Sequence, residues 1–271
     1  MSSTLPADLG GAVEAARSRL KGFDRIEYHA EVGSTNDIAL ARASLGAPHG
    51  TVIIADAQNS GRGRLGRVWH SPPDAGLYMS AVLRADSWSD TLSLVTMAAG
   101  IAVVKGLRAA TGLDAELKWP NDVVVGRPWR KLAGILSETA SASAEVDAVV
   151  VGIGVNLRAG SFPSELGHRA TALEIELGRS VDRSSCTVEI LAALADCASR
   201  LSSERTWVAA EWRRYGSAGL GGSPVRWQDG GAVRKGTAID IDDAGALIVS
   251  VDGGRERVIS GEVIWERLNR E

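Results

Sequence analysis

The chain has 271 residues, of which 45% are apolar and 23% are charged. That length fits one large domain, or one large and one small domain, and the composition excludes a disordered or collagen-like chain. The formal net charge of −3 argues against a protein that binds nucleic acid over a broad basic surface.

Targeting and membrane segments are not expected. The N-terminal residues lack a basic stretch followed by an apolar run, so we predict no secretory signal. The apolar stretch from Leu92 to Val104 is too short to span a bilayer, so we predict no membrane contact. Cys186 and Cys197 fall in one predicted helix and cannot form a disulfide framework, which favours a reducing compartment. We therefore expect a soluble, cytoplasmic protein.

In the first part of the chain, helices and strands follow each other without the strict alternation of a doubly wound sheet. The hydrophobic pattern predicts helices over residues 1–22, 34–45 and 90–110, and strands over residues 23–32, 51–57 and 76–84. Ser34 or Thr35 is expected to cap the second helix, with Asp37 placed to reciprocate. Gly46 is expected to end that helix.

The second part begins with short strands over residues 114–119, 122–126, 131–138 and 146–155, followed by helices over 186–203 and 205–214. After the glycine-rich segment 217–224, only short β segments follow, separated by DGG and DDAG turns. The pattern predicts an α+β domain with a mixed sheet over residues 1–218 and a small SH3-like β-barrel over residues 219–271.

The segment from Gln58 to Trp69 is the most informative, because glycines alternate with arginines directly after a buried strand. Glycine lets a backbone approach a ligand closely, and arginine donates paired hydrogen bonds to carboxylate or phosphate. The pattern therefore predicts a loop that wraps an anion. Its alternating residues are Gly61, Arg62, Gly63, Arg64, Gly66 and Arg67. The alternatives are a solvated basic turn and an RNA contact, and the net charge disfavours the second.

A second candidate is the turn that runs from Lys118 to Asp122. Pro120 is expected to hold Trp119 extended, so that the turn presents Lys118, Asn121 and Asp122. A lysine and a carboxylate at one turn could hold a phosphate and its Mg²⁺. The same residues are also common in a plain structural turn.

Two predicted strands contain glycines within apolar sequence. Gly134 follows Lys131, and a glycine within a strand often marks the close approach of a ligand. The alternative for Lys131 is an exposed lysine that protects a sheet edge. Gly152 and Gly154 predict a bare patch on which a flat ring could lie, with Asn156 placed to hydrogen-bond it; the alternative is a β-bulge.

Other polar residues give weaker signals. Ser34, Thr35 and Asn36 stand at a predicted helix N-terminus, which is either a simple cap or a site for an anion or carbonyl. The four histidines lack the spacing of metal ligands, and no Ser-His-Asp arrangement is visible.

Five segments together resemble the biotin protein ligases, the family that attaches biotin to carboxylase carrier domains. In chain order they are GSTN (33–36), GRGRLGRVW (61–69), KWPND (118–122), RKLAGIL (130–136) and GIGVNL (152–157). The ordered set is more specific than any one segment. The resemblance implies an α+β catalytic domain related to lipoate ligases and class II aminoacyl-tRNA synthetases, followed by an SH3-like domain.

The resemblance also implies a two-step reaction. The carboxylate of biotin attacks the α-phosphate of ATP, with Mg²⁺, and gives biotinyl-5′-AMP and pyrophosphate. A lysine of a biotin carboxyl carrier domain, from an acyl-CoA or pyruvate carboxylase, then attacks the adenylate and releases AMP. Biotin and ATP, the two substrates of the first step, are both anions, so their repulsion has to be neutralised. The cations available in these segments are Arg62, Arg64, Arg67, Lys118 and Lys131.

Residue by residue, the resemblance implies three overlapping sets. Biotin would contact Ser34, Thr35, Asn36, Gln58, Gly61, Arg62, Arg64, Lys131, Gly134 and Ile135. ATP or the adenylate would contact Arg62, Arg67, Trp69, Lys118, Asn121, Asp122, Lys131 and Asn156. Catalysis would depend on Lys131, together with Arg62, Arg67 and Lys118. No metal ligands are assigned.

Some members of this family begin with a winged-helix DNA-binding domain. The residues that precede GSTN are too few for such a domain, so we expect a ligase that does not bind DNA. The segment Ala170 to Leu173 departs from the family pattern, and we assign no nucleotide contact there. The alternatives are a lipoate-type ligase and a biotin sensor without turnover.

Overall fold

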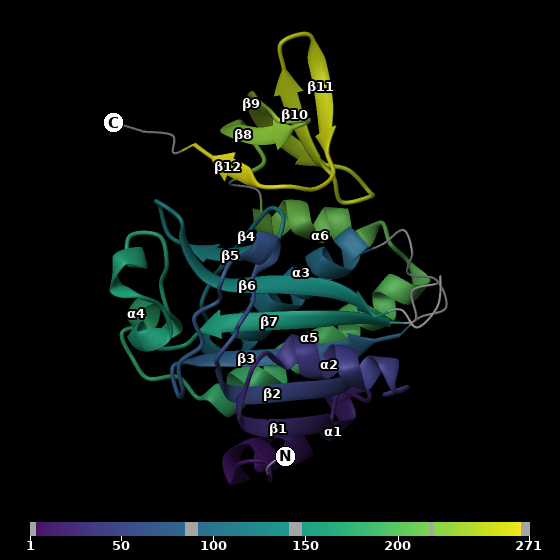
Figure 1. Cartoon of the computed structure of the whole chain (residues 1–271), viewed down its shortest axis with the longest axis vertical. Helices are drawn as coiled ribbons and strands as arrows, with labels where there is room; N and C mark the ends of the chain where they lie inside the picture. Colours follow the sequence, from purple (N-terminus) through teal and green to yellow (C-terminus); the bar gives the residue numbers. More distant parts are fainter. Residues whose placement is uncertain (1–3, 85–91, 141–147, 217–218, 267–271) are drawn as a thin grey trace.

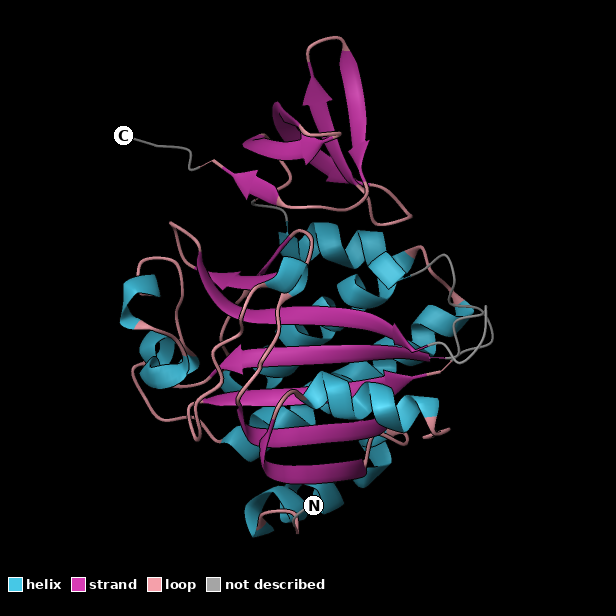
Figure 2. Cartoon of the chain, in the orientation of Figure 1, coloured by secondary structure: helices cyan, strands magenta, loops and turns pink. Residues whose placement is uncertain are grey.

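The computed structural model describes residues 4–84, 92–140, 148–216 and 219–266. Within these ranges the chain forms one large and one small β-sheet, and the helices accompany the large one (Figures 1 and 2). Residues 1–3, 90–91, 146–147, 217–218 and 267–271, which belong to predicted elements or to the predicted domain boundary, lie outside the described residues.

The elements agree closely with the predicted order. The helices are α1 (Ala7–Leu20), α2 (Thr35–Ser44), α3 (Leu92–Thr111), α4 (Leu173–Leu177), α5 (Arg183–Ser203) and α6 (Trp207–Gly216). The strands of the large sheet are β1 (Arg25–Val32), β2 (Thr51–Gln58), β3 (Gly76–Leu83), β4 (Glu116–Lys118), β5 (Asp122–Val125), β6 (Arg130–Ala140) and β7 (Ala148–Asn156). The small sheet comprises β8 (Ser223–Asp229), β9 (Ala232–Ile241), β10 (Leu247–Val251), β11 (Gly254–Val258) and β12 (Val263–Trp265).

The large sheet has the strand order β1-β2-β3-β7-β6-β5-β4. Only β1 and β2 pair in parallel, and every other neighbouring pair is antiparallel. This mixed sheet confirms the predicted α+β class. The small sheet is wholly antiparallel, in the order β11-β10-β9-β8-β12, and stands at one end of the molecule beyond α6 (Figure 1).

The main core lies on one face of the large sheet, where α3 packs against α5 and α6, and α5 also packs against α1. Gly106 allows α3 and α5 to approach, because a Cβ atom there would lie 2.5 Å from the Cα atom of Ile190. Cys186 and Cys197 are both buried in α5 as free thiols, as the sequence predicts.

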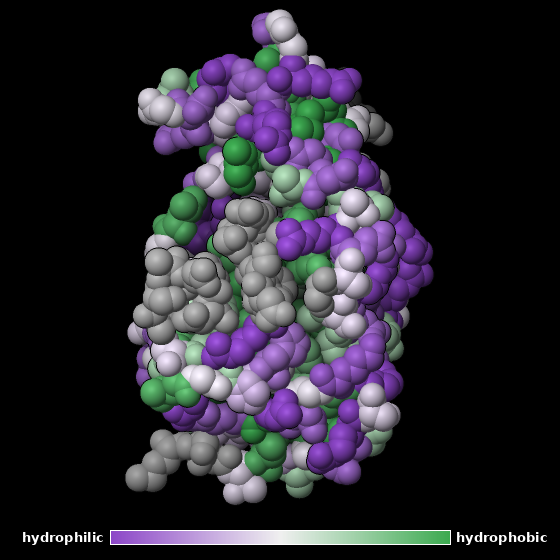
Figure 3. All heavy atoms as spheres, turned by 90° about the vertical axis from the view of Figure 1, so that its right-hand side faces the viewer, coloured by the Kyte–Doolittle hydropathy of each residue, from purple (hydrophilic) through white to green (hydrophobic). Residues whose placement is uncertain are grey.

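The apolar helix α3 is longer than the stretch considered in the sequence. Its 20 residues are long and apolar enough to cross a membrane by length and composition, so length alone does not exclude a membrane span. However, 67% of its most apolar window is buried inside the protein, as expected for a core helix. The side of the molecule shown in Figure 3 is mostly hydrophilic from top to bottom, and apolar residues form small groups on it.

The opposite face of the large sheet is covered only in part. Helix α2 packs there on β2, β3, β6 and β7 and closes a second, small apolar cluster. Beside α2, the loop that follows β2 crosses this face, and the segment that follows β7 lies at the end of the strands, on the left in Figure 2. The candidate site lies between α2, these two segments and the small sheet.

Candidate active site

A cavity of about 600 Å³ opens over the central strands of the large sheet. Every predicted site residue except Gly61 lines it. The lining also includes residues to which the sequence assigned no role, among them Ser161, Phe162, Arg169, Ala170 and the strip from Gly261 to Trp265. These residues form two polar regions in the cavity. One has few charges, and the other is cationic.

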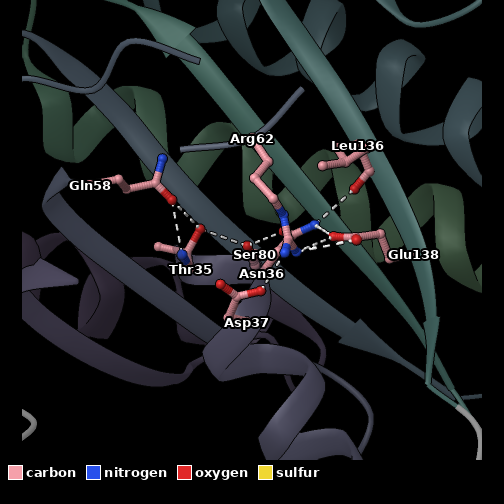
Figure 4. Close-up of polar contacts among 8 residues, drawn as sticks. All are labelled: Thr35, Asn36, Asp37, Gln58, Arg62, Ser80, Leu136 and Glu138. Carbon is pink, nitrogen blue, oxygen red and sulfur yellow. Dashed lines mark hydrogen bonds and ion pairs between the residues drawn. The ribbon is translucent and has the colours of Figure 1, made fainter. Parts of the chain in front are cut away.

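The first region is a network of buried polar side chains at the start of α2. The backbone N–H and the hydroxyl of Thr35 both donate to Oε1 of Gln58, at 2.9 and 3.1 Å. The hydroxyl oxygen of Ser80, on β3, lies 2.7 Å from Thr35 Oγ1 and 2.5 Å from Asn36 Oδ1 (Figure 4). Gln58 in turn donates to Ser71 Oγ at 2.9 Å. This region therefore presents neutral donors and acceptors whose positions are fixed by one another.

The predicted capping box at α2 is wrong. Ser34 is the N-cap residue, but its side chain makes no capping hydrogen bond. Asp37 does not reciprocate, because its carboxylate pairs with Arg62 at 2.7 Å instead. Ser34 is buried and lines the cavity, so the first turn of α2 faces the site.

The arginine–glycine segment forms a short hairpin over the cavity. Arg62 and Val68 form a β-bridge, and the N–H of Trp69 donates to the carbonyl of Gly61 at 2.9 Å. Gly61 does not line the cavity, because it packs against the returning strand of this hairpin. A Cβ atom at Gly61 would lie 2.4 Å from the carbonyl oxygen of Trp69. Its role is therefore a close backbone approach within the loop.

The bare patch predicted on β7 exists, and an aromatic side chain of the chain itself occupies it. Gly154 pairs directly with Gly134 on β6, and the indole of Trp69 lies over both glycines. A Cβ atom on Gly154 would lie 2.5 Å from Trp69 Cε2. The alternative of a β-bulge in β7 is wrong, since its pairing with β3 and β6 is continuous through Gly152 and Gly154.

Lys131 is an interior residue of the sheet, not an edge residue. Strand β6 lies between β5 and β7, so the interpretation of Lys131 as a lysine that protects a sheet edge is wrong. The register between β5 and β6 shifts next to Lys131, and such a bulge re-aims a side chain. This explains why the Lys131 side chain lies over Gly134, three positions further along the strand. Its ammonium lies 5.3 Å from the centre of the Trp69 ring.

The second region of the cavity is cationic. The ammonium of Lys131 lies 2.6 Å from Oδ1 of Asp122, on β5. Lys118, Arg67 and Arg169 line the same region, where each positive charge acts on its neighbours. Burial lowers the pKa of Lys118 below its usual range, Asp122 opposes this shift, and the nearby Lys131 and arginines reinforce it. Cations held this close together favour the binding of a polyanion.

The lowered pKa of Lys118 predicts a pH effect on nucleotide binding. A group with a lowered pKa loses its proton at a lower pH than a free lysine, so the region loses one positive charge as the pH rises through that value. We expect ATP affinity to weaken roughly tenfold over this alkaline range, measured by titration calorimetry. Lys118→Arg, which stays charged, should move the loss to higher pH. An unchanged profile in that variant would show that another group is responsible.

Two loop arginines contact the small sheet. Arg67 forms an ion pair with Glu262, which precedes β12. Arg64 was expected to contact biotin, but its hydrogen bonds go to Asn121 Oδ1 at 3.4 Å and to the carbonyl of Gly261 at 3.5 Å. Burial lowers its pKa, which reflects this enclosed position. Arg64 therefore lies at the junction between the loop and the small sheet.

Two predicted asparagines are engaged with the backbone. The amide of Asn156 donates to the carbonyls of Thr171 and Lys131, at 2.9 and 3.4 Å, so its N–H groups are not available to a ring on the glycine patch. Asn121 donates to the carbonyl of Ile135 at 2.8 Å, next to a cis peptide bond between Trp119 and Pro120. These side chains hold the strands and turns around the cavity in place.

The described residues contain no group of three or more His, Cys, Asp or Glu that could hold a metal ion by itself. The carboxylates that line the cavity are Asp122 and Glu262, each already paired with a cation. Mg²⁺ commonly binds through one or two carboxylates together with substrate phosphates. The site therefore fits a Mg²⁺ ion that arrives with a nucleotide.

Comparison with known proteins agrees with this geometry. Residues 30–156 match the biotin/lipoate A/B protein ligase family, and residues 220–265 match the biotin protein ligase C-terminal domain. The chain is 37% identical to the biotin–[acetyl-CoA-carboxylase] ligase of Mycobacterium tuberculosis, over 91% of each chain. The chain belongs to the biotin protein ligase family.

This ligase is also 33% identical to the bifunctional ligase/repressor BirA of Bacillus subtilis, over 87% of its own length and 72% of that relative. Among solved structures it is similar to the biotin protein ligase from Aquifex aeolicus in complex with biotin and ATP. The TM-score is 0.76 and the identity 26%, covering 90% of this ligase and 99% of that chain. These relatives confirm the α+β fold and the ligase class of enzyme.

Proposed function

We propose that this ligase joins biotin to ATP as biotinyl-5′-AMP, with release of pyrophosphate, and then transfers biotin to a lysine amine, with release of AMP. The observation that supports this most directly is the pairing of two regions in one cavity. The neutral network of Thr35, Gln58 and Ser80 suits the ureido group of biotin, which needs both donors and acceptors. The cationic region suits the phosphates of ATP.

The adenylation step brings a carboxylate to a phosphate, so it requires cations at the point where they meet. Lys131 is the residue best placed for this, because it lies between the glycine patch and the other cationic side chains. We propose Lys131 as the catalytic residue, with Lys118 and Arg67 toward the polyphosphate. The acceptor lysine amine attacks the adenylate itself and releases AMP, so this step needs no side-chain nucleophile of the ligase.

We propose the remaining roles from position. Ser34, Thr35, Asn36, Gln58, Gly134 and Ile135 would surround biotin, and Trp69, Asn121 and Asp122 would contact ATP or the adenylate. Mg²⁺, when bound with ATP, would supply further positive charge at the phosphates, beside Asp122. Arg62 was also expected at the phosphates, but its guanidinium pairs with Asp37 and Glu138.

We propose further that the acceptor is the biotin carboxyl carrier domain of an acyl-CoA or pyruvate carboxylase, that the ligase acts in the cytoplasm, and that neither DNA nor a membrane is a partner. The division at residues 218 and 219 is also proposed, and the separate C-terminal sheet that begins at Ser223 supports it. The strip from Gly261 to Trp265 lines the cavity, so both parts would contribute to the site.

The decisive experiment is biotin-dependent exchange of labelled pyrophosphate into ATP, with lipoate in a parallel reaction. Exchange with biotin alone is expected. Exchange with lipoate alone would contradict the proposal and favour a lipoate-type ligase, and biotin binding without exchange would indicate a sensor. Transfer is then measured on a carrier domain, with its acceptor lysine replaced by arginine as the control.

A further inference from the structure

Arg62 lies between two carboxylates that come from distant parts of the chain. One guanidinium nitrogen lies 2.7 Å from Oδ1 of Asp37, on α2. Another lies 2.8 and 3.2 Å from the two carboxylate oxygens of Glu138, on β6 (Figure 4). With two negative charges on one guanidinium, this cluster has a net charge of −1. Arg62 therefore adds no positive charge to the cationic region of the cavity.

Glu138 also joins this cluster to the neutral polar network. Its Oε2 accepts a hydrogen bond from Nδ2 of Asn36 at 2.6 Å, while Oδ1 of Asn36 lies 2.5 Å from Ser80 Oγ. Ser80 contacts Thr35, which donates to Gln58. A continuous series of polar contacts thus runs from the loop arginine to the residues proposed to bind biotin.

Arg62 stands at the base of the hairpin that covers the cavity. Its backbone bridges to Val68, and the next residue, Trp69, returns to the carbonyl of Gly61. The indole of Trp69 then lies over Gly154 and beneath the ammonium of Lys131. Fixing the Arg62 side chain therefore fixes the base of the hairpin and, through it, the aromatic ring that contacts Lys131.

We propose that Asp37 and Glu138 are positioning residues that act through Arg62, holding the base of the hairpin against α2 and β6 so that the biotin end of the cavity is formed in advance. The naming of that end rests on the proposed function. This assignment replaces the phosphate-binding role that the family resemblance implied for Arg62. A guanidinium with two carboxylate partners is already neutralised and gains little from a third anion.

The test is the double variant Asp37→Asn, Glu138→Gln, which keeps the shapes and removes both charges. In the ligand-free protein, trypsin cleavage within the hairpin, after Arg62, Arg64 or Arg67, is expected to rise about tenfold. In pyrophosphate exchange, KM for biotin is expected to rise about tenfold, and kcat is expected to fall because Trp69 is held less firmly against Lys131. KM for ATP is expected to change less than about twofold. Arg62→Lys, which keeps the charge but loses the planar fork, should change both measurements in the same direction.

The matched control is Glu189→Gln. Glu189 holds Arg19 through two oxygens, at 2.7 and 2.9 Å, and its side chain is 23% exposed against 31% for Glu138, but the pair does not line the cavity. In this variant, trypsin should cleave the hairpin at the parent's rate, and the KM values in pyrophosphate exchange should equal those of the parent. Unchanged hairpin cleavage in the double variant, or a rise in KM for ATP with KM for biotin unchanged, would overturn the proposal. The cleavage measurement needs no substrate, so it tests whether Asp37 and Glu138 hold the hairpin even if the proposed function fails.

Discussion

Lys131→Met is expected to slow biotin-dependent pyrophosphate exchange by about 10²–10³-fold, with little change in the midpoint of thermal unfolding. The ammonium lies 2.6 Å from Asp122, 5.3 Å from the centre of the Trp69 ring and directly over Gly134. At this place it can stabilise the charge that develops between the biotin carboxylate and the α-phosphate, and the loss of one such donor typically has an effect of this size. Because the interaction strengthens in the transition state, kcat should fall more than KM rises.

Lys105→Met is a closely matched control. The side chain of Lys105 is 34% exposed, like that of Lys131, and pairs with Glu211 at 2.7 Å, but it lies on α3 away from the cavity. Exchange should be unaffected in this variant. If both lysine variants lost activity equally, or if Lys131→Met kept full exchange, Lys131 would not be the catalytic residue.

Gly154→Ala is expected to reduce adenylation by about 10²-fold through one added methyl group. The new Cβ atom would lie 2.5–2.9 Å from three atoms of the Trp69 indole, so the ring has to move. The ring supports the Lys131 ammonium, and a displacement of this kind near a reacting group commonly has an effect of this size. Overpacking should also destabilise the fold by about 1–3 kcal/mol.

Gly160→Ala provides the comparison for this variant. It lies in the short helical turn Ala159–Ser161 beside the cavity, and its added Cβ atom would meet only the Cβ of Ala75, at 3.9 Å. Its activity should equal that of the parent. Tryptophan fluorescence should change in Gly154→Ala and not in Gly160→Ala. Full activity in Gly154→Ala despite a changed fluorescence would contradict the proposed support of Lys131 by Trp69.

Element order and fold class could be predicted from the sequence because each helix and strand depends on local periodicity. The 20-residue α3 and the alternating strands of the small sheet both have strong patterns of this kind. Helix α4 was missed, since five residues hold little more than one turn of periodic signal. The position of β6 inside the sheet could not be predicted, because strand order depends on contacts between distant segments.

The residues that line the cavity were predicted better than the contacts they make. The glycine patch was identified, yet its occupant, Trp69, comes from a distant loop that folds back over the sheet. Arg62 looked like an anion ligand because its two carboxylate partners, Asp37 and Glu138, are separate in the sequence. Ser80 was missed, since a serine in an apolar strand gives no signal of its own until Thr35 and Asn36 are placed against it.

The cavity combines residues made early and late in protein synthesis. Arg67 pairs with Glu262, a residue 195 positions later, and the strip up to Trp265 forms part of the wall. Until residues 261–265 have been made and folded, this part of the wall is missing. A chain that stops before them would leave Arg67 without its partner Glu262 and the cationic region open on that side.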